Sequence, residues 1–226
     1  MPVWCFDLFF TLVTSRSHVY GHEMDYLDIT PEEWERCVID SGAYLGRVTQ
    51  PLDVVREFVR QSGIHVAHSV LEQMCERRVA RVREIVTRVE PEILETLREL
   101  RRRGHRLCLI SNADAIDALH WRDSPLAPLF GEAIFSCDVH MVKPDPAIYL
   151  LAAQKMAAAP EDCIFVGDGG SDELMGAKRA GMRTIQARHF VQLEVAGADW
   201  VAERFGDLLS HPLCPSGISP KGATGK

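Results

Sequence analysis

Three features are missing from this sequence, and each absence excludes a class of protein. No stretch approaches the ~18 consecutive apolar residues that a membrane-spanning helix needs. The 7 cysteines form no CxxC pair and are odd in number, which fits neither a disulfide framework nor a zinc site. The apolar N-terminus lacks a basic leader and a small-residue cleavage site, so we do not interpret it as a signal peptide. We therefore expect a cytoplasmic protein that does not enter a membrane.

Excess positive charge is also absent. The net charge of −7 disfavours binding to nucleic acid. The one basic cluster, Arg101, Arg102 and Arg103, precedes Gly104, as is typical of the last turn of a helix, where cations oppose the helix dipole. The expected partner is a small-molecule substrate, and the sequence does not indicate an oligomeric state.

Short apolar segments alternate with helical patterns along most of the chain. We expect strands at residues 3–9, 105–111, 133–136, 163–167 and 182–186, and helices at 91–104, 146–157 and 171–181. Apolar runs of this length are typical of parallel strands covered on both faces. The sequence therefore predicts an α/β fold with a doubly wound, Rossmann-like parallel sheet.

Residues 15–88 differ from the rest, because they show helical patterns and no strand. Thr30 to Glu33 form a capping box with proline at the first helical position, which predicts a helix ending near Asp40. Further helices are expected at 51–61 and 69–88. We therefore predict a core domain of residues 1–14 and 89–210, an inserted helical cap domain of residues 15–88, and a disordered, Pro-, Gly- and Ser-rich tail of residues 211–226.

Four groups of polar residues follow expected strands or lie in loops at one edge of the sheet. Ligands of open α/β sheets bind beyond the carboxyl ends of the strands, so these groups are the candidates for a site. They are Asp7-Leu8-Phe9-Phe10-Thr11, Ser111-Asn112, Lys143-Pro144-Asp145-Pro146 and Gly167-Asp168-Gly169-Gly170-Ser171-Asp172.

Together these groups contain the parts that phosphoryl transfer needs, although each alone is also explained by a turn or a solvated side chain. Asp7, Asp168 and Asp172 supply the hard oxygen ligands that Mg²⁺ prefers. Lys143 and the hydroxyls of Thr11 and Ser111 can hold an anionic group. Lys143 is the first lysine of an arginine-rich chain, which indicates a need for a compact ammonium at this position.

The order of the four groups resembles the haloacid dehalogenase-like superfamily over about residues 3–201. This resemblance implies that Asp7 is the nucleophile, and that Mg²⁺ is held by Asp7, Asp168, Asp172 and the backbone carbonyl of Phe9. It also implies that the inserted helices form a C1-type cap. The implied binding residues for the transferred group and substrate are Thr11, Ser111, Asn112, Lys143, Phe9 and Phe10.

The first group departs from the family's phosphatases, which resemble DxDGT there. Phe9 replaces the second Asp, the usual general acid, and Phe10 replaces the glycine, so we expect a differently shaped turn. Haloacid dehalogenases of the superfamily also lack that Asp and use no metal, but they resemble Ser-Ser-Asn at the fourth group, where this chain has Gly167 and Asp168. Phosphonate-cleaving relatives use a cap lysine, and residues 15–88 contain none.

The leading hypothesis is a Mg²⁺-dependent, phosphatase-like hydrolase of a small phosphorylated metabolite that works through an aspartyl-phosphate intermediate. The candidates for the missing acid are His18, His22 and Glu23 of the cap segment, and His140. The first alternative is a metal-independent 2-haloacid dehalogenase, and the second is a weakly active phospholigand-binding or regulatory protein. The sequence does not name the substrate, because specificity lies in cap loops that have no readable code.

Overall fold

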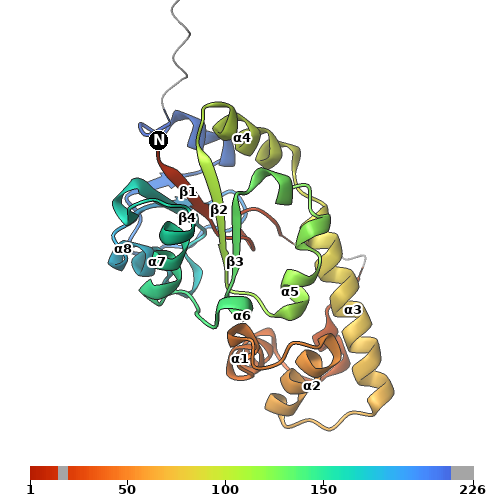
Figure 1. Ribbon diagram of the computed structural model, residues 1–226. Coiled ribbons are helices and arrows are strands. Elements are labelled where there is room, and N and C mark those ends of the chain that lie inside the picture. The colour runs from red at the N-terminus through yellow and green to blue at the C-terminus, as the bar shows by residue number, and fades with distance from the viewer. Residues whose placement is uncertain (15–19, 215–226) are drawn as a thin grey trace, which may run out of the picture.

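A six-stranded parallel sheet forms the centre of the computed structural model, which describes residues 1–14 and 20–214 (Figure 1). The strand order is β3-β2-β1-β4-β5-β6, and every pairing is parallel. The strands are β1 (Val3–Phe6), β2 (Arg106–Ser111), β3 (Glu132–Phe135), β4 (Cys163–Gly167), β5 (Arg183–Ala187) and β6 (Trp200–Ala202). The predicted α/β fold is confirmed, with β6 as a short edge strand that the sequence analysis missed.

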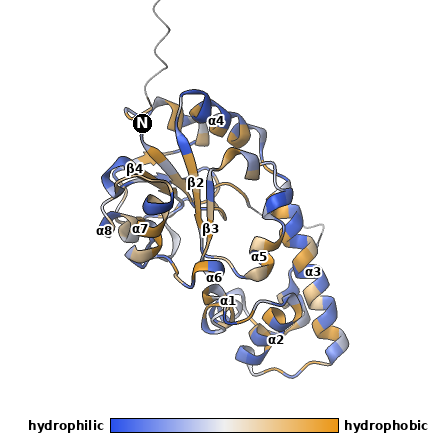
Figure 2. Ribbon diagram, viewed as in Figure 1, coloured by the Kyte–Doolittle hydropathy of each residue, from blue (hydrophilic) through white to orange (hydrophobic). Residues whose placement is uncertain are grey.

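Both faces of the sheet are covered, which explains its continuous apolar strands. Val3 and Cys5 of β1 pack on one side with α7 (Pro146–Lys155) and α8 (Glu173–Arg179). Trp4 and Phe6 pack on the other side, where α4 (Pro91–Arg102) lies. Figure 2 shows the contrast between the largely hydrophobic central strands and the mixed surfaces of α3 and α4. The alternation along β1 therefore supplies two cores.

The helices between β1 and α4 lie beyond the carboxyl ends of the strands (Figure 1). They are η1 (Glu23–Tyr26), α1 (Pro31–Asp40), η2 (Ala43–Leu45), α2 (Pro51–Ser62) and α3 (His68–Thr87), and we call α1, α2 and α3 the cap helices. The predicted capping box is present, since the Glu33 N–H donates to Thr30 Oγ1 at 3.2 Å and the Thr30 N–H donates to Glu33 Oε2 at 2.8 Å. The Trp34 and Phe58 rings pack edge to face at 5.5 Å and join α1 to α2. The division into a core and a cap domain stays a prediction.

Short helical segments complete the connections between the strands. They are α5 (Ala115–Leu119), η3 (Trp121–Asp123), η4 (Ala127–Leu129), α6 (Ser136–Val139), η5 (Pro160–Asp162), η6 (Gly170–Asp172) and η7 (Phe205–Ser210). Within the described ranges, no helix is both long enough and apolar enough to cross a membrane.

The predicted disordered tail begins too early. His211 packs edge to face against the Trp4 ring at 5.9 Å, and Cys214 is buried. The Arg103 guanidinium donates to the carbonyl oxygens of Leu209 and Cys214 at 2.8 and 3.1 Å. The prediction was therefore wrong for residues 211–214, because these apolar and polar contacts hold them on the core. Residues 215–226 lie outside the described residues.

Candidate active site

Asp7 follows directly after β1 at the carboxyl edge of the sheet. Its N–H donates to the Val166 carbonyl oxygen at 2.9 Å, which continues the pairing of β1 with β4 by one residue. The buried carboxylate of Asp7 accepts a hydrogen bond from the ammonium of Lys143. The same Lys143 Nζ lies 2.6 Å from Oε2 of Glu173. One buried lysine therefore bridges two buried carboxylates.

The turn after β1 contains the three other residues predicted from the first group. Phe10 has a φ of 59°, a left-handed conformation that favours glycine and costs other residues about 1–2 kcal/mol. Its N–H donates to the Val13 carbonyl oxygen at 2.7 Å, and its side chain is half exposed. Thr11 is buried, with Oγ1 3.4 Å from Asp7 Oδ2. Phe9 and Phe10 both line the cavity above Asp7, so Phe10 takes a glycine-like backbone and adds an aromatic wall.

Ser111 and Asn112 end β2 beside this turn. Ser111 is fully buried, and its Oγ lies 3.4 Å from the Asn112 carbonyl oxygen. The Asn112 side-chain amide is paired with the backbone of Lys143: Oδ1 accepts from the Lys143 N–H at 2.8 Å, and Nδ2 donates to the Lys143 carbonyl oxygen at 3.0 Å. Asn112 therefore fixes the position of the lysine, although it also lines the cavity.

Two glycines of the fourth group, residues 167–172, allow Glu173 to approach the backbone of this loop closely. A Cβ at Gly167 would lie 2.0 Å from Glu173 Oε1, so a larger residue would collide with this carboxylate. Gly169 has a φ of 101°, and its N–H donates to the same oxygen at 3.1 Å. Asp168 is buried between these glycines. The glycines therefore position Glu173 beside Asp168.

The predicted ligand Asp172 lies outside this group. Its side chain is 59% exposed, and one carboxylate oxygen lies 3.6 Å from Arg179 Nη1. Ser171 and Asp172 both have a positive φ, 52° and 55°, so α8 starts only at Glu173. That turn directs Glu173, rather than Asp172, into the site. The sequence analysis missed Glu173 because the adjacent acids are equivalent candidates until the start of the helix is known.

Asp7, Asp168 and Glu173 form a compact carboxylate cluster. One oxygen from each lies within 4.8 Å of the other two. Burial raises the pKa of Asp7, and the negative charge of Asp168 adds to this effect while Lys143 opposes it. Burial raises the pKa of Glu173 to about 8. The negative charges of Asp7 and Asp168 add to this effect, and the positive charge of Lys143 opposes it. Burial alone would lower the pKa of Lys143, but Asp7 and Glu173 raise it, so the lysine stays charged.

The charges of the cluster do not balance within the chain. If all three carboxylates were ionised, they would exceed the single ammonium by two negative charges in a buried place, and the raised pKa values of Asp7 and Glu173 reflect that cost. A divalent cation would remove the excess, and carboxylate oxygens are the ligands that Mg²⁺ prefers. The donor set therefore fits Mg²⁺.

A cavity of about 490 Å³ connects this cluster to the cap helices. Asp7, Lys143, Asp168 and Glu173 line one end. The other end is lined by Trp34 and Val38 of α1, Arg78 and Arg81 of α3, Tyr44, and Asp117 of α5. The volume is that of a small-molecule site.

Of the candidates for a replacement acid, His18 lies outside the described residues, and the other three have different surroundings. His22 lines the cavity, but its Nδ1 accepts from the Met24 N–H at 3.2 Å and burial lowers its pKa. Burial alone would raise the pKa of Glu23, but the neighbouring guanidinium groups lower it to about 2, so it stays ionised. His140 is not among the described residues that line the cavity, and its Nδ1 lies 2.8 Å from the Leu45 carbonyl oxygen. His22 alone of the three combines access to the cavity with a titratable ring.

Curated proteins that resemble this chain include two phosphatases. It is 31% identical over 101 residues to a glyceraldehyde 3-phosphate phosphatase of Methanopyrus kandleri, which covers 43% of this chain and 42% of that protein. It is 29% identical over 150 residues to the phosphoglycolate phosphatase of Escherichia coli (strain K12), which covers 62% of this chain and 57% of that one. The chain thus matches about half the length of these curated relatives.

Solved structures of a phosphatase and of a dehalogenase share the fold of this chain. A HAD phosphatase from Thermococcus onnurineus superposes with a TM-score of 0.63 at 24% identity, and a 2-haloacid dehalogenase from Pseudomonas syringae pv. Tomato DC3000 with 0.67 at 23%. Each comparison covers 93% of this chain and 97% of the other. A family model described as haloacid dehalogenase-like hydrolase matches residues 14–181, which is most of the chain. This chain therefore belongs to the haloacid dehalogenase-like hydrolases.

Proposed function

We propose that this chain is a Mg²⁺-dependent phosphatase that hydrolyses a small phosphate ester through a phosphorylated Asp7. The observation that carries the proposal is the buried cluster of Asp7, Asp168 and Glu173 around Lys143, which lines a cavity. Such a cluster offers oxygen ligands to a hard cation and an ammonium to an anionic substrate. The phosphatase names of two curated relatives support the same reaction.

The residues of the chain divide the reaction between them. An oxygen of Asp7 attacks phosphorus, and the bond from phosphorus to the leaving oxygen breaks. Water then attacks the phosphorus of the aspartyl phosphate, which releases inorganic phosphate and restores the carboxylate. Lys143, held by Asn112, binds a phosphoryl oxygen, and the Thr11 and Ser111 hydroxyls lie at the same edge of the sheet.

Asp7, Asp168 and Glu173 would hold the Mg²⁺, with the backbone carbonyl of Phe9 as the further ligand that the family resemblance implies. When bound, the cation offsets the negative charge of the carboxylates and of the phosphoryl oxygens. Asp172 is not in the proposed ligand set, because its carboxylate faces Arg179 and solvent.

The rival reaction, metal-independent dehalogenation, fits the site less well. Without a cation, Asp168 and Glu173 repel a nucleophilic Asp7 carboxylate and favour its protonated, unreactive form. A panel of phosphate esters, acyl phosphates and 2-haloacids, assayed with Mg²⁺ and with EDTA, separates the reactions. We expect phosphate release that EDTA abolishes, whereas consumption of a 2-haloacid in EDTA with no phosphate release would establish the dehalogenase.

Asp7→Asn should abolish phosphate release while the protein stays folded, because an amide is not a competent nucleophile. Folding raises the pKa of Asp7, so its ionised form costs stability at neutral pH, and the variant should melt at a higher temperature in metal-free buffer. Steady-state assays and thermal melts check both expectations. Residual activity above about a hundredth of wild type, roughly 2.7 kcal/mol in barrier, rules out covalent catalysis by Asp7.

Glu173→Gln and Asp172→Asn form a matched pair of neighbouring substitutions. Glu173→Gln should weaken Mg²⁺ binding at least about tenfold, because it removes a carboxylate from the cluster. Asp172→Asn should leave the affinity close to wild type, because that side chain lies outside the cluster. Titration calorimetry with Mg²⁺ measures both. The reverse order of the two effects would show that Asp172 is the ligand.

The absence of an acid at Phe9 predicts how the rate depends on the leaving group. Without proton donation, hydrolysis should slow as the pKa of the leaving alcohol rises, so aryl and acyl phosphates should react much faster than alkyl phosphates. Phe9→Asp should selectively accelerate alkyl phosphates, by up to the ~100-fold low end of general acid catalysis. A series of phosphate esters assayed with both proteins gives the slopes. A flat slope in the wild type would mean that His22 or another group already donates the proton.

A further inference from the structure

The cavity that connects the carboxylate cluster to the cap helices has a surface that is more apolar than polar. Large apolar side chains reach it from three parts of the chain, the turn after β1, α1 and α3. They include Phe9, Phe10, Trp34, Ile39, Val82 and Ile85. We call these six residues the apolar wall. A ligand whose phosphoryl group lies at Lys143 would therefore meet mainly carbon atoms with the rest of its structure.

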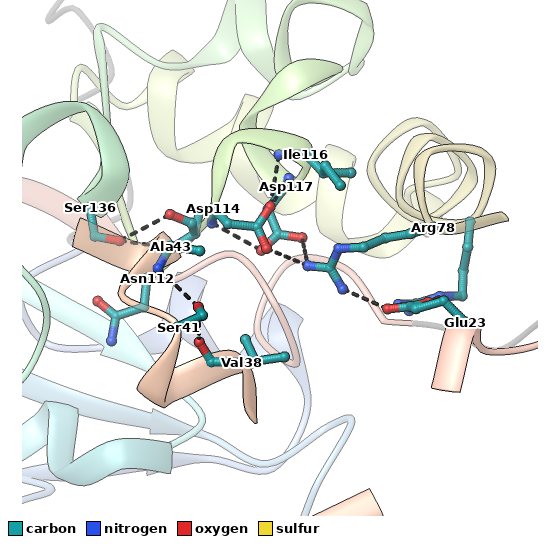
Figure 3. Close-up of polar contacts among 12 residues, drawn as sticks. Glu23, Val38, Ser41, Ala43, Arg78, Asn112, Asp114, Ile116, Asp117 and Ser136 are labelled. Carbon is teal, nitrogen blue, oxygen red and sulfur yellow. Dashed lines mark hydrogen bonds and ion pairs between the residues drawn. The ribbon is translucent and has the colours of Figure 1, made fainter. Parts of the chain in front are cut away.

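The charged residues near the cap helices are paired with one another (Figure 3). Nη1 of Arg78 donates to Glu23 Oε1 at 2.7 Å. Nη2 of Arg78 donates to Asp114 Oδ2 at 2.6 Å and to Asp117 Oδ1 at 2.9 Å, and the second oxygen of Asp117 accepts from the Asp114 N–H at 3.2 Å. Arg81 donates to Glu23 through Nε and Nη2. A ligand that bound these groups would have to replace ion pairs already made, so they add little affinity for a leaving group.

Two members of the apolar wall are exposed although they are large. Phe10 is 51% exposed and Ile39 is 56% exposed, and both line the cavity. Phe10 also has a φ of 59°, a conformation that glycine adopts without the cost that other residues incur. The half-exposed ring forgoes much of the burial that could offset this cost within the chain. An apolar ligand in the cavity would remove both side chains from water and supply that burial.

The size of the cavity sets the size of the group that can fill it. Its volume of about 490 Å³ lies in the range of about 300–1,000 Å³ that holds drug-sized ligands. Phe9, Phe10 and Trp34 supply aromatic rings to the wall, and such rings pack favourably with a ring of a ligand. The cavity therefore has both the room and the surface for a ring next to the phosphoryl group.

We infer that the apolar wall selects phosphate monoesters whose leaving group is apolar and as large as an aromatic ring. The inference rests on the proposed phosphatase function and narrows its substrate class. It predicts a substrate unlike those in the names of the two curated relatives, because the leaving groups of phosphoglycolate and glyceraldehyde 3-phosphate are small and polar.

Titration calorimetry with the full chain in Mg²⁺ tests this selectivity. The probes are propylphosphonate, 3-hydroxypropylphosphonate and 3-phenylpropylphosphonate, whose C–P bond replaces the ester, so the heat reports binding without turnover. The phenyl compound should bind at least about tenfold tighter than the propyl compound, and the hydroxyl compound no tighter than the propyl compound. Excess inorganic phosphate should compete with the phenyl compound, which locates it at the carboxylate cluster.

Three variants test whether the apolar wall is the source of the preference. Phe10→Gly and Ile39→Gln should each reduce the preference for the phenyl compound several-fold. Both should stay folded, because glycine fits the φ of residue 10 and residue 39 is exposed, and circular dichroism checks this. Leu150→Gln is the matched control and should leave the preference unchanged. Leu150 is 45% exposed on α7 and is absent from the described residues around the cavity.

The wild-type comparison decides the inference without any variant. Equal affinity for the three phosphonates, tightest binding of the hydroxyl compound, or no binding of any of them overturns it. A full preference in both folded variants overturns the role of the apolar wall. Phosphate release from 4-nitrophenyl phosphate tests the proposed function separately. Release without a preference would mean that only the inference is wrong, and a preference without release would mean that only the phosphatase function is wrong.

Discussion

The contact of Lys143 with both Asp7 and Glu173 is the interaction on which the site depends. Three carboxylates, two after parallel strands and one at the start of α8, are costly to bury, and one internal ammonium offsets part of that cost. The lysine is itself held by the Asn112 side chain, which pairs with its backbone on both sides. Removing the ammonium would leave the negative charges of Asp7 and Glu173 buried and uncompensated. Lys143 therefore stabilises the folded site in addition to its proposed role in catalysis.

Two buried cations that line the cavity, Lys143 and Arg78, are each surrounded by carboxylates. At each end a buried cation is surrounded by more carboxylates than it can neutralise. At the Asp7 end, bound Mg²⁺ would offset the surplus of negative charge, and a phosphoryl group could then bind there, as proposed above.

Much of the fold was predictable from the sequence because local patterns decide it. The apolar run at residues 3–9 predicted a strand, which the structure confines to Val3–Phe6, and the capping box at Thr30 predicted the start of α1, which is confirmed. The choice of Glu173 over Asp172 was not predictable, because it depends on two residues with positive φ that have no glycine signal. The ion pairs of Arg78 with Glu23, Asp114 and Asp117 were also missed, since Arg78 and Asp114 meet only when α3 packs on α5.

The central claim is that Asp7 takes up the phosphoryl group, and trapping that intermediate tests it most directly. The enzyme would be mixed with an aryl phosphate and Mg²⁺, quenched in acid during turnover, digested and examined by mass spectrometry. A phosphoryl group on the peptide that contains Asp7, absent when the substrate is omitted, is the expected result. Turnover with Asp7 unmodified, or with the phosphoryl group on another residue, would contradict the mechanism.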